Sequence, residues 1–138
     1  MVATGAEAVV LLVARVLFGG VLAFMGLNHF MQTEQMTGYA RHKGLPAPRL
    51  GVLGSGAILV VAGLAIVAGV FPLLAAAALA AFLLVSAVVF HDFWAVPEDQ
   101  QQDEMTNFLK NVVMAGGALA FGAIASQSWG LSVGLGLV

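Results

Sequence analysis

The residues of this chain that could do chemistry gather where its long apolar stretches end. The segment VVFHDFWAVPEDQ, residues 88 to 100, closes one such stretch with His91 and Asp92 between aromatic rings. Histidine titrates near neutral pH, so an imidazole beside a carboxylate can donate a hydrogen bond or move a proton. The segment could therefore be a catalytic site, an anchor at the membrane edge or ordinary packing.

More polar side chains are expected at the same end of the molecule. Asn28 and His29 end the first apolar stretch, and Lys110 and Asn111 begin the last one. If these stretches are antiparallel helices, both pairs meet the VVFHDFW segment at one membrane face. Polar residues at span ends also have an ordinary structural role. On that interpretation Asp92 pairs with Lys110 or a histidine, and the asparagines satisfy loop backbone.

One chemical interpretation of this cluster is a site for a quinone head group. His91 could donate a hydrogen bond to a quinone carbonyl, while Asp92 orients the imidazole or takes up a proton. The aromatic rings of the segment could stack on the quinone: Phe90, Phe93 and Trp94. Aromatic rings at a helix end also anchor spans at the membrane interface, so the structural alternative stays open.

A second chemical interpretation is a metal ion held by two histidines and one carboxylate, which are His29, His91 and Asp92. No two of these three residues have the i, i+4 spacing that favours ligation from one helix. The sequence therefore predicts no metal site.

Arg15 stands apart because it interrupts the first apolar stretch. A charge at mid-membrane costs a few kcal/mol unless it faces a partner or snorkels to the interface. Its partner could be Glu7 or Asp92. A span over residues 6–27 places Arg15 in the membrane, whereas a span over 13–31 places it near one edge, and both registers stay open.

The composition predicts an integral membrane protein. Of 138 residues, 61% are hydrophobic and 9% are charged, with a mean hydropathy of +1.01, whereas about a quarter of residues are charged in soluble domains. The net charge of −2 and the lack of a basic patch argue against a nucleic-acid partner. Without cysteine, the chain cannot form disulfides, zinc thiolate sites or cysteine-held iron–sulfur clusters.

Charge-poor stretches of about 20 residues predict an all-α membrane protein, a bundle of four transmembrane helices in one domain, residues 1–138. Pro72 divides the uncharged run from Leu50 to Phe90, because proline fits the first turn of a helix. Trp129 suits the aromatic belt on the far side. The predicted spans cover residues 6–27, 50–70, 72–93 and 105–125.

A short helix is expected between spans one and two, from Thr33 as its cap to about His42, resting on the membrane surface. The cations of that loop predict that both charged loops are cytoplasmic and both termini outside. Small residues at four-residue spacing predict where helices approach each other. These are Gly51 with Ser55, and Ala118 with Gly122 and Ser126.

Five ordered motifs resemble those of the DoxX family of small integral membrane proteins, over about residues 15–125. They are ARVLFGG at 14–20, GLNHF at 26–30, KGLPAP at 43–48, FHDFW at 90–94 and NFLKN at 107–111. The resemblance implies a four-helix membrane protein, with relatives in a thiosulfate:quinone oxidoreductase and in a thiol-stress complex with a superoxide dismutase and a sulfurtransferase. It points to Arg15, Asn28, His29, His91, Asp92, Trp94, Lys110 and Asn111.

Together these observations predict a subunit of the prokaryotic inner membrane that anchors a redox enzyme complex or gives it access to quinone. No cofactor other than quinone is indicated, and the lack of cysteine argues against direct sulfur handling. The expected partners are the lipid bilayer, a soluble or membrane redox protein and further copies of the chain. Whether the chain is itself an enzyme is left open. The alternatives are a structural or assembly protein without catalysis and, third, a small-solute transporter, which the shortage of intramembrane polar residues disfavours.

Overall fold

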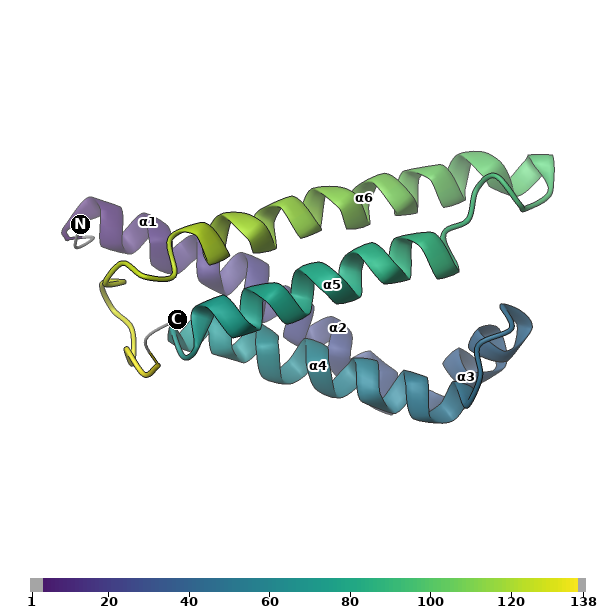
Figure 1. Cartoon of the computed structure of the whole chain (residues 1–138), viewed down its shortest axis with the longest axis horizontal. Coiled ribbons are helices and arrows are strands. Elements are labelled where there is room, and N and C mark those ends of the chain that lie inside the picture. The colour runs from purple at the N-terminus through teal and green to yellow at the C-terminus, as the bar shows by residue number, and fades with distance from the viewer. Residues whose placement is uncertain (1–3, 137–138) are drawn as a thin grey trace.

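The computed structural model describes residues 4–136 and is all-helical in its regular elements, as the sequence predicts (Figure 1). A single π-helical turn interrupts the first long helix. The elements are α1 (Ala6–Arg15), η1 (Val16–Gly20, the π turn), α2 (Val21–Met31), α3 (Thr33–His42), α4 (Pro48–Ala68), α5 (Pro72–Phe90) and α6 (Glu98–Ala123).

Within residues 4–136, three helices are long and apolar enough to cross a membrane: Ala6–Met31, Pro48–Ala68 and Pro72–Phe90. The first of them runs unbroken through both registers considered for the first span. α6 has 26 residues and begins at Glu98, ahead of the predicted start at 105, because two acidic residues in its first turn complement the helix dipole. Because its first turns are polar, α6 is not apolar enough to be counted with these three helices.

The turn between α4 and α5 is tight, as predicted. α4 ends at Ala68 and is capped by Gly69, whose φ of +69° is a left-handed conformation that glycine adopts without strain. Pro72 lies in the first turn of α5. That helix ends at Phe90, so the last three residues of the predicted span, 91–93, lie in the following turn.

The short helix α3 has the predicted bounds, but Thr33 does not cap it. Gln32 occupies the cap position and makes no side-chain capping bond. The Thr33 hydroxyl instead lies within bonding distance of the carbonyls of His29 and Phe30, at 2.8 and 2.9 Å. Thr33 therefore ties α3 to the end of α2. Ala40 on the inner side of α3 is buried.

Two glycine pairs set the distance between the first long helix and α4. A Cβ at Gly19 would lie 2.3 Å from the Gly63 carbonyl oxygen, and one at Gly26 would lie 2.8 Å from that of Gly56. The two pairs are seven residues apart on each helix, and at these pairs the first long helix and α4 approach each other most closely. The sequence pattern predicted Gly51 and Ser55 as contact positions and did not identify these glycines. Ala118, by contrast, is fully buried in the core, as its spacing predicts.

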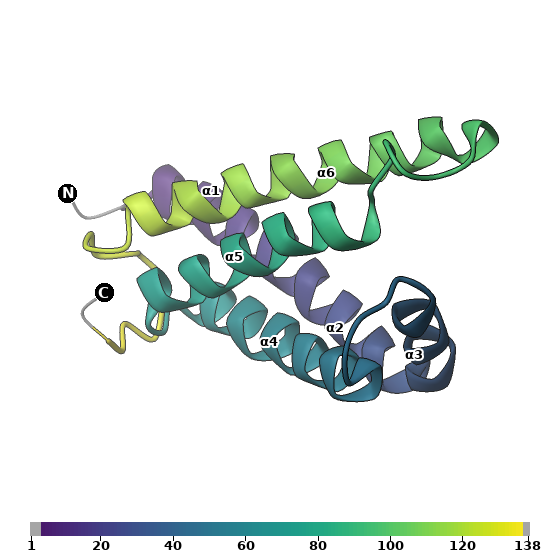
Figure 2. The same ribbon diagram turned by 45° about the vertical axis from the view of Figure 1, so that its right-hand side comes forward.

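Both ends of the described chain lie on one side of the bundle, which we name the terminal end. α3 and the α5–α6 connection lie on the opposite side, the loop end (Figures 1 and 2). At the terminal end the segment after α6 folds back over the α4–α5 turn. The Phe71 amide donates to the Leu135 carbonyl, and the Val133 amide donates to the Ala68 carbonyl, each at 2.8 Å.

Candidate functional site

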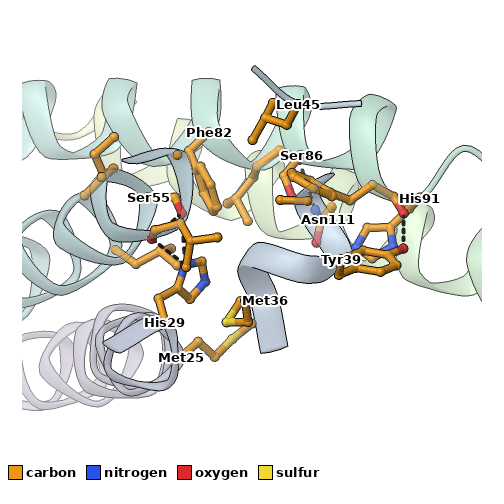
Figure 3. Close-up of a pocket in the computed structure, with 18 of the residues that line it drawn as sticks. Met25, His29, Met36, Tyr39, Leu45, Ser55, Phe82, Ser86, His91 and Asn111 are labelled. Atoms are coloured by element: carbon orange, nitrogen blue, oxygen red, sulfur yellow. Dashed lines mark hydrogen bonds between the residues drawn. The ribbon is translucent and has the colours of Figure 1, made fainter. Parts of the chain in front are cut away.

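A cavity that could hold a ligand lies toward the loop end, between α2, α3, α4, α5 and α6 (Figure 3). It has a volume of about 560 Å³, and most of its lining is apolar. Three residues predicted for the site line it: His29, His91 and Asn111. Tyr39, Ser55 and Ser86 add hydroxyl groups to the lining. The fold thus brings polar groups from five helices to one apolar cavity.

The two histidines are each fixed through Nδ1. In His29 this atom lies 2.9 Å from the Ser55 hydroxyl and 3.1 Å from the Val52 carbonyl. In His91 it lies 2.8 Å from a carboxylate oxygen of Glu104 on α6. Because no hydrogen bond to Nε2 of either ring is found within residues 4–136, that nitrogen is the one available to a ligand.

Tyr39 and Asn111 hold the walls of the cavity in place. The Tyr39 hydroxyl donates to the Phe90 carbonyl at 3.1 Å, and the two rings stack with centroids 6.0 Å apart. Burial raises the pKa of Tyr39, with a further contribution from the charge of Glu104, so this hydroxyl stays protonated and can donate. Asn111 is buried and donates through Nδ2 to the Leu83 carbonyl at 3.2 Å.

An ion pair between Lys43 and Asp92 joins the end of α3 to the turn after α5. Their side chains are 13% and 23% exposed, so the pair is only partly screened by water. Their hydrogen bond raises the pKa of Lys43 and lowers the pKa of Asp92. The prediction that Asp92 pairs with Lys110 or a histidine is therefore wrong. Asp92 ties the loops together and does not line the cavity.

Three further residues predicted for the site also lie outside the cavity. Trp94 is 56% exposed and packs edge-on against Phe93 and Phe108, so neither Phe93 nor Trp94 could stack on a ring inside the cavity. Asn28 is half-buried and Lys110 is exposed. Helical geometry explains the split, because Asn28 and Lys110 precede His29 and Asn111 by one residue and so point about 100° away.

Arg15 lies at the terminal end and is fully buried. Its guanidinium donates to the Leu131 carbonyl at 2.6 Å and to that of Gly130 at 3.4 Å, and it lies 5.7 Å from the centre of the Trp129 ring. Neither Glu7 nor Asp92 is its partner. Trp129, which the sequence assigned to an interfacial belt, is buried at 8% exposure between Arg15 and Phe121.

The histidines and acids do not form a metal-binding cluster in residues 4–136, where no three such side chains come close enough to hold one ion. His29 bonds to Ser55, His91 to Glu104 and Asp92 to Lys43. The three ligands of the alternative metal site are thus engaged separately.

Sequence reasoning missed Glu104, Tyr39 and Ser55. Glu104 lies in a run that reads as a solvated acidic loop, and only the early start of α6 brings it beside His91. Tyr39 could have been found, because Met36, Tyr39 and Ala40 share one face of the short helix and all three line the cavity. Nothing in the sequence relates Ser55 to His29.

These features define an all-α integral membrane protein with a mostly apolar cavity, lined by a few polar groups, toward one end of its helical bundle. Comparison with known proteins places it further. The family model of DoxX matches residues 10–92. The chain is also 31% identical over 114 residues to the inner membrane protein YphA of Escherichia coli strain K12, which covers 83% of this chain and 81% of that protein. No solved structure matches the chain.

The chain belongs to the DoxX family, as its motifs indicate. The family match ends at Asp92, so it contains three of the five motifs and the first three residues of FHDFW, and NFLKN at 107–111 lies beyond it. The cavity is therefore built mostly from residues of the family region, and α6 completes it with Asn111.

Proposed function

We propose that this protein is a membrane subunit that binds a quinone in the loop-end cavity and gives a redox enzyme complex access to it. The single observation that carries the proposal is the cavity itself, about 560 Å³ in volume, apolar along its walls and lined by two imidazoles, a phenol and an amide. Cavities of this size and character suit small ligands that need orientation by a few polar groups. A quinone would supply two-electron, two-proton chemistry at its ring oxygens.

The chemistry of the lining fits a neutral aromatic ring. Tyr39, Phe82 and Phe90 offer aromatic surface, and the Nε2 atoms of His29 and His91 can bond to ring oxygens. Among the described residues no lysine or arginine lines the cavity, so a phosphate or carboxylate head group would find no cation there. These features favour a quinone over a phospholipid head group or an anionic solute.

The pair of His91 and Glu104 gives the cavity a route for protons. The imidazole lines the cavity, and the carboxylate that it contacts belongs to the polar first turns of α6. A histidine held by a carboxylate can take a proton on one ring nitrogen while it gives one up from the other. Electrons must come from a partner, since the chain has no cysteine for thiol chemistry and the cavity is lined by no redox-active side chain other than Tyr39.

The proposal includes α6 as a fourth span and loop-end residues in the cytoplasm. α6 packs along α5, burying Ala115, Ala118 and Phe121, and Arg41, Lys43 and Arg49 lie at the loop end. Because the chain has no native cysteine, single cysteines can report topology directly. An impermeant maleimide added to intact cells should label Gln127→Cys and spare Gln100→Cys. Labelling of both or of Gln100 alone would contradict this topology.

The proposed function is tested by native mass spectrometry of the protein extracted gently from its own membrane, with the lipid fraction assayed for quinone. We expect bound quinone or a redox partner in the wild type, and loss of the quinone in His91→Ala and Asn111→Leu. The matched controls are Asn28→Ala and Lys110→Leu, whose side chains lie outside the cavity. Folded His91→Ala that retains all quinone, or wild type with ordinary lipid alone, would support the structural alternative.

A further inference from the structure

We propose that the seam between α4 and α5 binds the isoprenoid tail of the quinone, so that the ligand is a long-chain isoprenoid quinone which enters sideways from the bilayer. This inference rests on the proposed function and adds the part of the ligand that gives it affinity and a route of entry. It is drawn from a second cavity, continuous in its lining with the first.

The second cavity, which we name the tail groove, has a volume of about 450 Å³ and lies between α4 and α5. Every residue that lines it has a hydrocarbon side chain. Ile58 lines both cavities, so the tail groove starts where the loop-end cavity ends. From there it continues along the two helices toward their connecting turn at Phe71.

A row of residues on α5 connects the two cavities. Residues four apart on a helix lie one turn apart and about 40° round its axis, so such a row runs along the helix and winds slowly around it. Leu74 and Ala78 line the tail groove, and Phe82, Ser86 and Phe90 continue the same row into the loop-end cavity. These 16 residue steps correspond to about 24 Å at 1.5 Å per residue. The path is thus long enough for several isoprenoid units.

The tail groove is a shallow channel with a buried floor and exposed walls. Its floor is formed by buried alanines, among them Ala62 and Ala75 at 7% and 5% exposure. Its walls are larger side chains that project outward, with Val61 69% exposed and Leu74 67% exposed. A branched hydrocarbon chain laid between them would contact the walls on both sides, which the flat face of a helix does not offer.

The polarity along the path matches one amphiphile. Imidazole, phenol and amide groups lie toward the loop end, and only hydrocarbon lies toward the α4–α5 turn. A phospholipid has the same general polarity, but its phosphate would need a cation. Among residues 4–136 neither cavity is lined by lysine or arginine, and Lys43 is paired with Asp92. A neutral ring with an isoprenoid tail is the amphiphile that satisfies both ends.

The test compares quinones that share a head group and differ in the tail. The probes are a benzoquinone and a naphthoquinone, each with no tail and with four isoprenoid units, bound to protein in nanodiscs after subtraction of empty nanodiscs. We expect the tail to strengthen binding to the wild type by at least about tenfold. Ala78→Phe should fill the groove and abolish most of that advantage while the tailless probes bind as before. The matched control is Ala77→Phe on the neighbouring, exposed position, which does not line the groove.

The outcomes separate this inference from the proposed function. If tailless probes bind and the tail advantage is absent, or survives in Ala78→Phe, the groove holds ordinary lipid and the inference fails while the proposed function stands. If neither tailed nor tailless probes bind to the wild type, both fail. Should Ala78→Phe not fold, Ala57→Phe blocks the same groove from an exposed position on α4 and decides the question.

Discussion

Among the described residues, the one charge in the packed interior is Arg15 at the terminal end, which is fully buried and held by backbone carbonyls. At the loop end, two pairs lie beside a cavity: Lys43 with Asp92, and His91 with Glu104. The first arrangement leaves no room for a ligand at the guanidinium itself, because Trp129 and the segment after α6 close over it. A cavity of about 470 Å³ at this end is lined by that segment and the α4–α5 turn, and Arg15 does not line it. The second arrangement leaves a cavity of about 560 Å³. At the terminal end, packing and hydrogen bonds thus hold Arg15 in place, whereas the loop end has a cavity that a ligand could occupy.

The close helix contact next to Arg15 also belongs to the rigid end. The π turn places Gly19 against Gly63, and a π turn inside an α-helix often marks a position with a specific role. Here it follows Arg15 directly. The widened turn and the glycines let the first long helix lie against α4 at backbone contact, which van der Waals packing in lipid requires.

The largest effect should come from filling that contact. Gly19→Ala places a methyl group 2.3 Å from the Gly63 carbonyl oxygen, so the backbones must separate, and we expect a loss of about 3 kcal/mol in the free energy of unfolding. Titration with denaturing detergent in mixed micelles measures it. Gly20→Ala is the control, because its Cβ would find only Val16 at 4.0 Å. Equal stability of the two variants would mean that this end is not tightly packed.

The next effect should come from removing the buried cation. Arg15→Met leaves the Gly130 and Leu131 carbonyls without their donor, which we expect to cost about 2 kcal/mol and to loosen the segment after α6. Hydrogen exchange at the Val133 amide and the emission of Trp129, recorded in a Trp94→Phe background, report that segment. Arg15→Lys keeps the charge but lacks the forked guanidinium that donates to both carbonyls. Its stability should therefore lie between those of the wild type and Arg15→Met. Unchanged hydrogen exchange at the Val133 amide in Arg15→Met would show that the hydrogen bonds from Arg15 do not hold the segment after α6 in place.

A smaller effect with a defined pH dependence is expected at Lys43 and Asp92. The folded state lowers the pKa of Asp92, so its contribution is present above the unfolded value near 3.9 and is lost as the pH falls through the lowered pKa. It raises the pKa of Lys43, so that contribution is lost only as the pH rises through a value above about 10.4. Lys43→Met should therefore cost about 1 kcal/mol, evenly from about pH 5 to pH 9.

Melting curves of the wild type and Lys43→Met at several pH values measure this difference. It should shrink as the pH falls from about 4 through the lowered pKa of Asp92, where the carboxylate of the folded protein becomes protonated. Asp92→Asn should behave like Lys43→Met, and the double variant should cost no more than either alone. A difference that grows toward acidic pH would contradict the ion pair as its source.

The smallest effect on stability is expected at Glu104. Glu104→Gln keeps a hydrogen-bond acceptor for His91 but removes the charge, so the free energy of unfolding should change by less than about 1 kcal/mol. Quinone binding should weaken by roughly threefold or more, because His91 loses the charged acceptor that orients its ring. Glu98→Gln, on an exposed acid in the first turn of α6, is the control. Identical binding in both variants would remove Glu104 from the site.

The residues at the loop end show how much of the candidate site could be predicted from the sequence. The motifs around His29, His91 and Asn111 predict a polar cluster, and the fold brings these three to one cavity. The residues next to them in sequence, Asn28, Asp92 and Lys110, turn elsewhere, because a helix rotates by about 100° at each residue and the chain leaves α5 before Asp92. Spacing alone located the right end of the molecule but not the right side of each helix.

The sequence by itself determined the membrane class, the family, the position of the α4–α5 turn and the existence of α3, because length, hydropathy and proline placement act locally. Tertiary structure decided the partners: Lys43 for Asp92, Glu104 for His91, the Leu131 carbonyl for Arg15 and Gly63 for Gly19. Each pair joins helices or segments far apart in the chain. Such contacts depend on how the helices rotate and cross, which the pattern of any one helix does not specify.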